Sequence, residues 1–317
     1  MEFIFVEAVL GAENLRNPML EILQPDTDPY HAILYQHKGV LNAQPNHFGN
    51  ENQDTARNQF LGTIGLASRT NTALLVSPEY SCPWEVVKTV LTNAGAQPRD
   101  RALWALGCES ITPVSLRQFK NNFDGNAGVK IIFDETVLEK AGKFLDPLCY
   151  LFKTTTNDEA PVIVCLVQFK TQHMGVWNTP IERDNYIKGE KLYVFRNAAE
   201  SIYLFTLICS EALVFEVSDA FLNSVDHRWS LTPYIILNPQ LNPDSNHADF
   251  RQFRRKIFQA EKKEIITLNW ASGSSIKAEN AVIALNQFPG SGINTDADGI
   301  NFTRDDNFIQ NHQRGLY

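Results

Sequence analysis

The stretch Ile202-Tyr-Leu-Phe-Thr-Leu-Ile-Cys209 is an apolar run that ends in a cysteine. Two similar runs lie upstream: Ala73-Leu-Leu-Val-Ser-Pro78 precedes Glu79, and Val162-Ile-Val-Cys-Leu-Val-Gln-Phe169 precedes Lys170. Short apolar runs of this kind are typical of buried strands. In open α/β sheets, ligands bind beyond the carboxyl ends of the strands. We therefore expect a thiol, a carboxylate and an amine to meet at one sheet edge, where the cysteine would be an activated nucleophile.

The order of the elements around these runs indicates an α/β protein. Helices are predicted at 1–24, 54–69, 84–93, 113–123, 212–222 and 248–262. Strands are predicted at 31–36, 73–76, 102–107, 129–133, 148–153, 162–169, 192–195, 202–208, 234–237, 264–268 and 281–285, and a polar loop at 39–53. Few helices separate the strands in the middle of the chain, which favours a mixed sheet, or two sheets, over a simple doubly wound one.

Charge and cysteine content narrow the function class. The chain has 317 residues, a net charge of -8 and five cysteines, none of them in a CxxC pair. An acidic chain is a poor candidate for nucleic-acid binding through phosphate contacts, and an odd number of unpaired cysteines favours a reducing compartment. No apolar run is long enough to span a membrane, and the first residues do not form a secretory signal. We expect a cytoplasmic protein with neither a nucleic-acid nor a membrane partner.

Three motifs, in order and at fixed spacing, carry a family resemblance. They are Ser77-Pro-Glu-Tyr80, Gln168-Phe-Lys-Thr-Gln-His173 and Leu207-Ile-Cys-Ser-Glu211. Glu79 and Lys170 are 91 residues apart, Lys170 and Cys209 are 39 apart, and Glu182 and Gly189 lie between the last two. With Asn269 at the end of a later strand, the stretch from about 31 to about 285 resembles the carbon–nitrogen hydrolase (nitrilase) superfamily.

This resemblance implies a fold and a division of the chain. The family fold is a four-layer α-β-β-α sandwich with two mixed sheets, and its members pair into homodimers or higher homo-oligomers. We expect an N-terminal helical extension at 1–30, a catalytic domain at 31–285 and a polar C-terminal tail at 286–317. No closing strand is recognisable after Leu285, so the chain is also compatible with one domain of a larger protein.

The resemblance also implies roles for individual residues. Glu79 would be the general base, Cys209 the nucleophile and Lys170 the oxyanion donor, with Glu182 holding Lys170 charged. The neighbours Tyr80, Ser210 and Glu211 would bind the substrate, a small-molecule amide or, less favoured, a nitrile. The reaction would pass through a covalent thioester or thioimidate on the cysteine. No cofactor is implied, and no metal, because Asp296-Ala-Asp298-Gly299 lacks the spacing of a calcium loop.

Other interpretations remain open at this point. Taken singly, Cys209 is a buried thiol, Glu79 a helix-capping acid, Lys170 a strand-end charge and Glu182 a surface acid. Cys82 lies three residues after Glu79 and competes for the same place. The chain could also be a catalytically silent nitrilase-like module for oligomerisation or sensing in a larger system, for example a bacterial antiviral one, or it could transfer an acyl group to an amine. The sequence does not identify the substrate.

Overall fold

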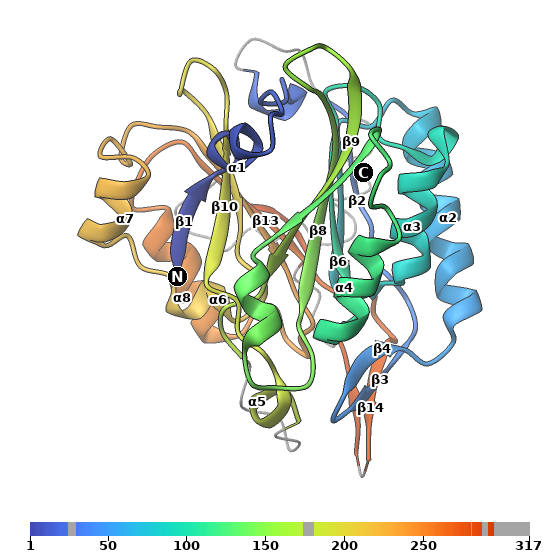
Figure 1. Cartoon of the computed structure of the whole chain (residues 1–317). Helices are drawn as coiled ribbons and strands as arrows, with labels where there is room; N and C mark the ends of the chain where they lie inside the picture. The colour runs from blue at the N-terminus through green and yellow to red at the C-terminus, as the bar shows by residue number, and fades with distance from the viewer. Residues whose placement is uncertain (25–29, 174–180, 280, 287–290, 295–317) are drawn as a thin grey trace.

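Two six-stranded sheets lie face to face, and helices cover their outer faces (Figure 1). The computed structural model describes residues 1–24, 30–173, 181–279, 281–286 and 291–294. Apolar side chains from the inner faces of both sheets pack against one another between them; for example, the rings of Tyr150 and Phe152 of the second sheet contact the ring of Phe195 of the first. The predicted four-layer α-β-β-α sandwich with two mixed sheets is therefore confirmed.

The first sheet carries the cysteine run. Its order is β1 (Glu2–Phe5), β10 (Lys191–Arg196), β11 (Tyr203–Thr206), β12 (Tyr234–Pro239), β13 (Lys263–Leu268) and β16 (Gly292–Asn294). Strands β11, β12 and β13 are parallel, whereas β10 and β16 run antiparallel to their neighbours β11 and β13. Because the inner and outer faces are both covered, these strands are apolar along nearly their whole length.

The second sheet carries the other two runs. Its order is β2 (Ala32–Leu34), β5 (Leu74–Cys82), β6 (Leu103–Cys108), β8 (Pro147–Thr155), β9 (Pro161–Phe169) and β7 (Val129–Phe133). Strands β8 and β9 form a long antiparallel pair in which Pro147 lies opposite Phe169. The pairing of β5 with β6 is irregular between Ser77 and Cys82, so the ladder is broken around Glu79.

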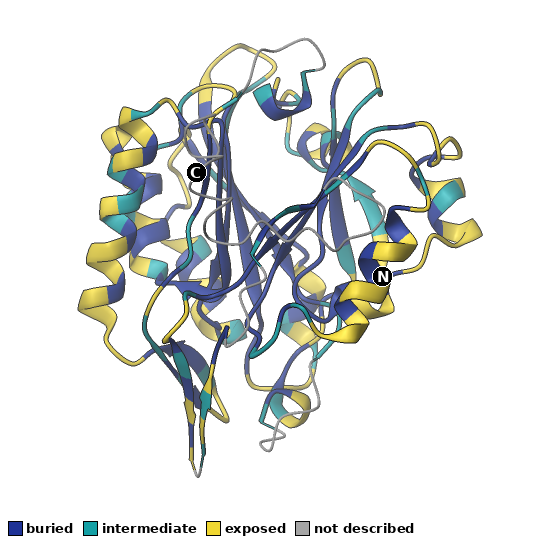
Figure 2. Ribbon diagram, turned by 180° about the vertical axis from the view of Figure 1, so that it is seen from behind, coloured by how far each residue is buried: buried dark blue, intermediate teal, exposed yellow. Residues whose placement is uncertain are grey.

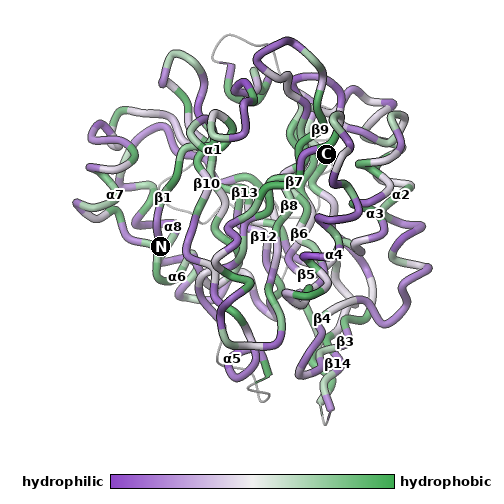
Figure 3. The backbone as a smooth tube through the Cα atoms, in the orientation of Figure 1, coloured by the Kyte–Doolittle hydropathy of each residue, from purple (hydrophilic) through white to green (hydrophobic). Residues whose placement is uncertain are grey.

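The helices form the two outer layers. On the second sheet lie α2 (Gln53–Arg69), α3 (Trp84–Thr92) and α4 (Pro113–Asn121), and near the first sheet lie α1 (Val6–Ala12), α6 (Glu211–Val214), α7 (Asp219–Ser224) and α8 (Ala248–Ile257). Short helical turns are η1 (Glu21–Leu23), η2 (Ala94–Ala96), η3 (Glu135–Glu139) and α5 (Ile181–Asn185). The outer helices bury one side and expose the other (Figure 2). The hydrophobic residues, green in Figure 3, concentrate on the central strands.

A third, small sheet projects from one end of the sandwich. Its order is β15 (Ala281–Ala284), β14 (Ser275–Ala278), β3 (Val40–Gln44) and β4 (His47–Asn50), and in Figure 1 it extends downward. The predicted polar loop at 39–53 is therefore wrong, because β3 and β4 form a hairpin there. The hairpin buries alternate apolar residues, Leu41, Ala43 and Phe48, beside Trp270 in a small core of its own.

The N-terminal segment also differs from expectation. The predicted helix at 1–24 is wrong: the segment begins as strand β1, parallel to β10, and only Val6–Ala12 forms an α-helix. The ring of Phe3 contacts the rings of Phe205, Phe215 and Phe221, so packing on the first sheet overrides the local helical pattern. The segment is thus no purely helical extension, and the predicted domain boundaries stay predictions.

Two further elements differ near the end of the chain. The predicted helix at 212–222 is two short helices, α6 and α7, with an extended break at Phe215. After Leu285, strand β16 pairs antiparallel with β13, so part of the predicted tail is a strand of the first sheet. Residues 295–317, including the Asp296–Gly299 stretch, lie outside the described residues. Among the described helices, none combines the length and the hydropathy that a membrane crossing needs.

Candidate active site

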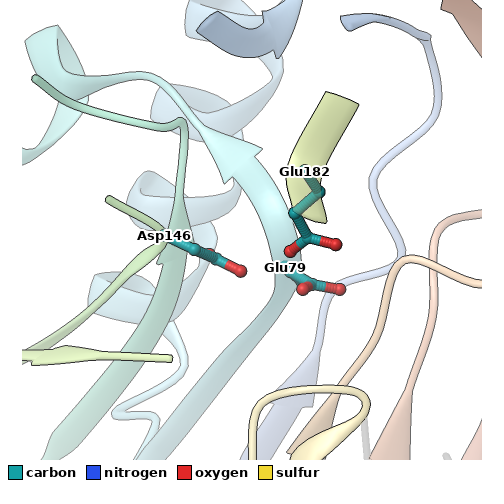
Figure 4. A group of neighbouring side chains, drawn as sticks. All are labelled: Glu79, Asp146 and Glu182. Atoms are coloured by element: carbon teal, nitrogen blue, oxygen red, sulfur yellow. The ribbon is translucent and has the colours of Figure 1, made fainter. Parts of the chain in front are cut away.

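Lys170 lies directly after β9 and is buried together with acidic side chains from other elements. Its side chain is 1% exposed. The Nζ atom donates to Glu79 Oε1 at 2.5 Å and to Glu182 Oε1 at 2.7 Å. Figure 4 shows the carboxyl groups of Glu79, Asp146 and Glu182 converging from separate elements. The structure thus brings three of the four candidate catalytic residues into direct contact around one ammonium group.

Two glycines allow the chain to pack closely at this point. A Cβ atom on Gly189 would lie 2.2 Å from the carbonyl oxygen of Phe169, and one on Gly107 would lie 2.2 Å from that of Pro78. Any larger residue would therefore push away the backbone that carries Lys170 or Glu79. Gly189 also donates its N–H to the Lys170 carbonyl at 2.9 Å. The close approach of the Phe169 carbonyl therefore explains why a glycine, Gly189, stands between the lysine and cysteine motifs.

Asp146 is a fourth titratable member of the cluster that sequence reasoning missed. Its Oδ2 lies 3.5 Å from Lys170 Nζ, and its side chain is 1% exposed. The Lys170 N–H donates to the Asp146 carbonyl at 3.0 Å, which continues the β8–β9 ladder by one position. The signal was available in principle, because a residue before Pro147 stands opposite the residue after Phe169 once the hairpin register is known.

The Glu79 carboxylate is held by donors on both oxygens. Besides Lys170, the backbone N–H of Leu241 donates to Oε2 at 2.8 Å. Trp270 Nε1 donates to the Glu79 carbonyl at 2.8 Å. The Asn269 side chain fastens the Leu241 segment by donating to the Asn242 carbonyl at 2.7 Å and accepting the Asn242 N–H at 3.1 Å. Asn269 therefore orients Glu79 through the loop that supplies the Leu241 N–H.

Cys209 sits in the turn between β11 and α6 in a strained backbone conformation. Its φ angle is +44°, a region that non-glycine residues rarely adopt. The turn is held by the Cys209 N–H, which donates to Pro239 O at 2.9 Å, and by Asn238 Nδ2, which donates to Leu207 O at 2.6 Å. The Sγ atom is buried, 4.0 Å from the Leu241 carbonyl. Strain at such a turn is frequent at functional sites.

The electrostatic environment links Cys209 to the lysine cluster. Burial raises the pKa of the Cys209 thiol well above its usual range, the charge of Glu79 raises it further, and the charge of Lys170 opposes both. Burial alone lowers the pKa of Lys170, but the neighbouring carboxyl groups, with the charges of Glu182 and Glu79 foremost, outweigh it and hold that pKa well above the usual value. At neutral pH the arrangement is therefore a neutral thiol in the field of a charged ammonium.

The predicted substrate-binding residues make contacts within the protein. Tyr80, at a φ of +56°, donates its hydroxyl to Glu182 Oε1 at 3.3 Å. Ser210 Oγ donates to the Gln172 carbonyl at 2.8 Å. Glu211 accepts the N–H groups of Thr171 at 2.5 Å and Ile208 at 2.6 Å. These bonds fasten the turns around Lys170 and Cys209, and substrate binding by the three residues stays a prediction.

Cys82 lies elsewhere despite its closeness to Glu79 in sequence. Its side chain is in the core between the second sheet and the helices α2 and α3, with Val86 and Trp104. Burial raises the pKa of the Cys82 thiol well above its usual range. The competing interpretation of Cys82 as a pocket residue is therefore not supported by its position.

The acidic cluster also has the composition of a cation site. One carboxylate oxygen from each of Glu79, Asp146 and Glu182 lies within 4.8 Å of the others. The Lys170 ammonium already lies among them, so it supplies the positive charge at this point. A separate cavity of about 430 Å³ is bounded by Glu13, Lys120, Phe123 and Lys130, and none of the candidate site residues lines it.

The chain is similar to solved structures at the level of architecture. One is the glutamine-dependent NAD+ synthetase of Acinetobacter baumannii, at 12% identity and a TM-score of 0.47 over 85% of this chain. The chain spans only 42% of that synthetase's length. Another is a nitrilase-superfamily amidase from Nesterenkonia, at 10% identity and a TM-score of 0.40, covering 83% of this chain and 84% of that one.

A further structure of the Nesterenkonia amidase shows acrylamide added at that enzyme's active-site cysteine. It is 11% identical to this chain, with a TM-score of 0.42, and covers 86% of this chain and 87% of that one. No family model matches the chain, and no curated protein sequence matches it.

Proposed function

We propose that this chain is a carbon–nitrogen hydrolase that cleaves a small non-peptide amide through a covalent thioester on Cys209. The observation that supports it most is the Lys170 ammonium, held at 2.5 Å from Glu79 and 2.7 Å from Glu182 and acting electrostatically on Cys209. A thiol, a base and a fixed positive charge are the groups that acyl transfer needs, and the charges of Glu79 and Lys170 acting on Cys209 support the proposal.

The first half-reaction begins with a neutral thiol. Glu79 takes the Sγ proton as the sulfur attacks the amide carbon, because the buried thiol does not ionise by itself at neutral pH. Negative charge then develops on the amide oxygen. Lys170 and the backbone N–H of Ser210 are the donors proposed to stabilise that oxyanion. Protonated Glu79 passes its proton to the leaving nitrogen, the C–N bond breaks, and an amine or ammonia departs.

The second half-reaction regenerates the enzyme with the same groups. Glu79, again a carboxylate, takes a proton from a water molecule that attacks the thioester carbon. The same donors stabilise the second oxyanion, and the collapse returns the proton to the sulfur while the carboxylic acid leaves. Glu182 keeps Lys170 charged and in place throughout, since a carboxylate 2.7 Å from an ammonium favours the cationic form. With a nitrile, attack of the sulfur would give a thioimidate, a first water would add and release ammonia to leave the thioester, and a second water would release the carboxylic acid as above.

The test is turnover of a panel of small amides and nitriles, measured as ammonia or amine release by the full chain. We expect Cys209→Ala to lower turnover by about 10⁴-fold or more, as removal of a nucleophile does in other hydrolases. Cys165→Ala is the matched control, because Cys165 is equally buried but lies in the core below the helices. Intact-mass analysis of acid-quenched reactions should show an acyl adduct that disappears with Cys209→Ala only.

Two outcomes would contradict the proposal. The first is turnover that survives Cys209→Ala. The second is the absence of turnover and of any adduct across the whole panel, which would favour the silent module. Product analysis with an added amine distinguishes hydrolysis from acyl transfer to the amine.

A further inference from the structure

We propose that Asp146 is a positioning residue of this site: its carboxyl keeps its proton and donates it in a hydrogen bond to the Glu79 carboxylate. This inference rests on the proposed function, because it concerns the base of that reaction. Asp146 precedes β8, and its side chain points toward those of Glu79 and Glu182 (Figure 4). It belongs to none of the three sequence motifs.

The charge balance of the cluster is the first reason. Three carboxyl groups surround one ammonium, and Glu79, Asp146 and Lys170 are each at most 2% exposed. Full ionisation would leave two uncompensated negative charges in a buried space. Two carboxylates that share a buried site do not both ionise readily, because like charges at this distance repel strongly. One of the three acids should therefore be neutral.

Hydrogen bonding identifies which acid that is. Glu79 receives donors on both oxygens, from Lys170 and Leu241, and Glu182 receives Lys170 and Tyr80 on Oε1. Neither oxygen of Asp146 accepts a hydrogen bond from the described part of the chain. Its closest cation is Lys170, whose Nζ lies 3.5 Å from Asp146 Oδ2. The same Nζ lies closer to Glu79 and Glu182, at 2.5 and 2.7 Å. An ionised Asp146 would be the least stabilised of the three.

The proximity of Asp146 to Glu79 also favours a protonated Asp146. One oxygen of each carboxyl group lies within 4.8 Å of an oxygen of the other, and a hydrogen bond to Glu79 is among the causes that raise the pKa of Asp146. Ionised carboxylates are acceptors only, so two of them side by side need a shared proton. Burial raises the pKa of Asp146 well above its usual range, and the charge of Glu79 raises it further against the opposing charge of Lys170.

The other titratable groups that act on this pair are Lys170, Glu182, Cys209, Tyr80 and Tyr186. Burial keeps the Cys209 thiol neutral. The pKa values of both phenols are raised well above the usual value, mainly by burial. They therefore stay neutral over the pH range of interest and add no charge that could compensate an ionised Asp146.

A neutral Asp146 has two consequences for the reaction. It fixes the direction of the Glu79 carboxylate without adding a third anion to compete for Lys170. Two N–H groups of Lys170 are directed at the glutamates, so the third remains for the developing oxyanion. Loss of the Asp146 proton at alkaline pH would place a second anion beside Glu79 and draw Lys170 away from the reacting oxygen. We therefore expect activity to fall on the alkaline side.

The experiment compares Asp146→Asn with Asp146→Ala and with Glu182→Gln across pH. Asparagine keeps the shape and a donor toward Glu79 but cannot ionise, so kcat/KM should stay within about threefold at neutral pH and the alkaline fall should move to higher pH. Alanine removes the donor and should cost about tenfold. Glu182→Gln removes an ion partner of Lys170 and should cost about 100-fold. A loss with Asp146→Asn as large as with Glu182→Gln would overturn the proposal, since it would mean an ionised Asp146.

A second readout does not depend on turnover. If Asp146 is protonated in the folded protein, its folded-state pKa is higher than its unfolded-state pKa of about 3.9. The contribution of Asp146 to the free energy of unfolding is then full below about pH 3.9, and it is lost as the pH rises toward the folded-state pKa. The melting temperature of Asp146→Asn should therefore rise relative to the wild type between about pH 4 and pH 8. Parallel curves, or a relative loss for the variant with rising pH, would overturn the proposal. If no amide is turned over, the proposed function fails. The pH dependence of the melting temperature still shows whether Asp146 is protonated in the folded protein.

Discussion

Two lysines of this chain are almost completely buried, and their surroundings differ in kind. Lys170 is 1% exposed and Lys263 is 2% exposed. The Lys170 ammonium lies among three carboxyl groups. The Lys263 ammonium donates instead to the carbonyl oxygens of Trp229, Thr232 and Glu261 at 2.6, 2.7 and 2.8 Å, and it lies 4.4 Å from the centre of the Trp229 ring.

The comparison shows that burial by itself does not mark a functional lysine. Carbonyl dipoles satisfy the hydrogen bonds of an ammonium group but do not neutralise its charge. Burial accordingly lowers the pKa of Lys263 to about 8, against an opposing effect of the charge of Asp226. At Lys170 the carboxylates reverse the effect of burial. Lys263, at the start of β13, fastens the segment that holds Trp229 and Thr232 before β12, whereas Lys170 is a fixed charge whose field acts on the Cys209 thiol.

The largest expected effect separates the two lysines by activity. Lys170→Met should lower kcat/KM by about 10²–10³-fold, because the proposed oxyanion donor is lost. It should also destabilise the fold by about 3–5 kcal/mol, because buried carboxylates lose their counter-ion. Lys263→Met should lower the melting temperature and leave kcat/KM within a few fold. Turnover assays and thermal unfolding of both variants check this prediction. Equal losses of activity would mean that Lys170 is no more important for activity than Lys263.

The next effect concerns how tightly the backbone fixes Lys170. Gly189→Ala places a Cβ where Phe169 O lies 2.2 Å away, so the Lys170 segment must shift. We expect a loss of about 1–3 kcal/mol in the free energy of unfolding, as for other overpacked sites, and a larger fractional loss of kcat/KM than for Lys263→Met. Gly62→Ala in α2 is the matched control, since nothing lies within 4 Å of its added Cβ. Unchanged kinetics in Gly189→Ala would mean that Lys170 tolerates displacement.

The smallest effect is a dependence of stability on pH that only Lys263 should show. Its folded pKa of about 8 is below its unfolded value, so the folded state holds the proton less tightly. Between about pH 8 and pH 10 the unfolded state binds more protons, and the free energy of unfolding of the wild type should rise relative to Lys263→Met. The rise should be on the order of 2 kcal/mol. Urea unfolding of both proteins across this window measures it, and a flat difference would show that Lys263 keeps its proton.

The sequence predicted the fold class and most strands because their apolar runs are long and uninterrupted. It failed where packing decides the local structure. Phe3 and Phe5 fit a helix as well as a strand until the aromatic residues of the first sheet are placed beside them. The hairpin at 40–50 reads as a polar loop because only alternate residues are buried, and their partner Trp270 is more than 200 residues away in the chain.

The candidate site divides in the same way. Order and spacing of the motifs were enough to select Glu79, Lys170, Glu182 and Cys209, because each stands beside a strand or a glycine with a recognisable pattern. Nothing local distinguishes Asp146 from any other acid before a proline. Its place beside Lys170 follows from the register of β8 against β9, a relation between segments that a one-dimensional pattern does not contain.

The candidate residues and their places beside apolar strands were readable from the sequence, because residue type and hydrophobic periodicity are local properties. The tertiary structure alone decided the number of carboxyl groups around Lys170, the donors on Glu79 and the side of the sheet on which Cys82 lies. Those properties depend on burial and on distances between segments far apart in the chain, and burial and distance set the charge state of an ionisable group.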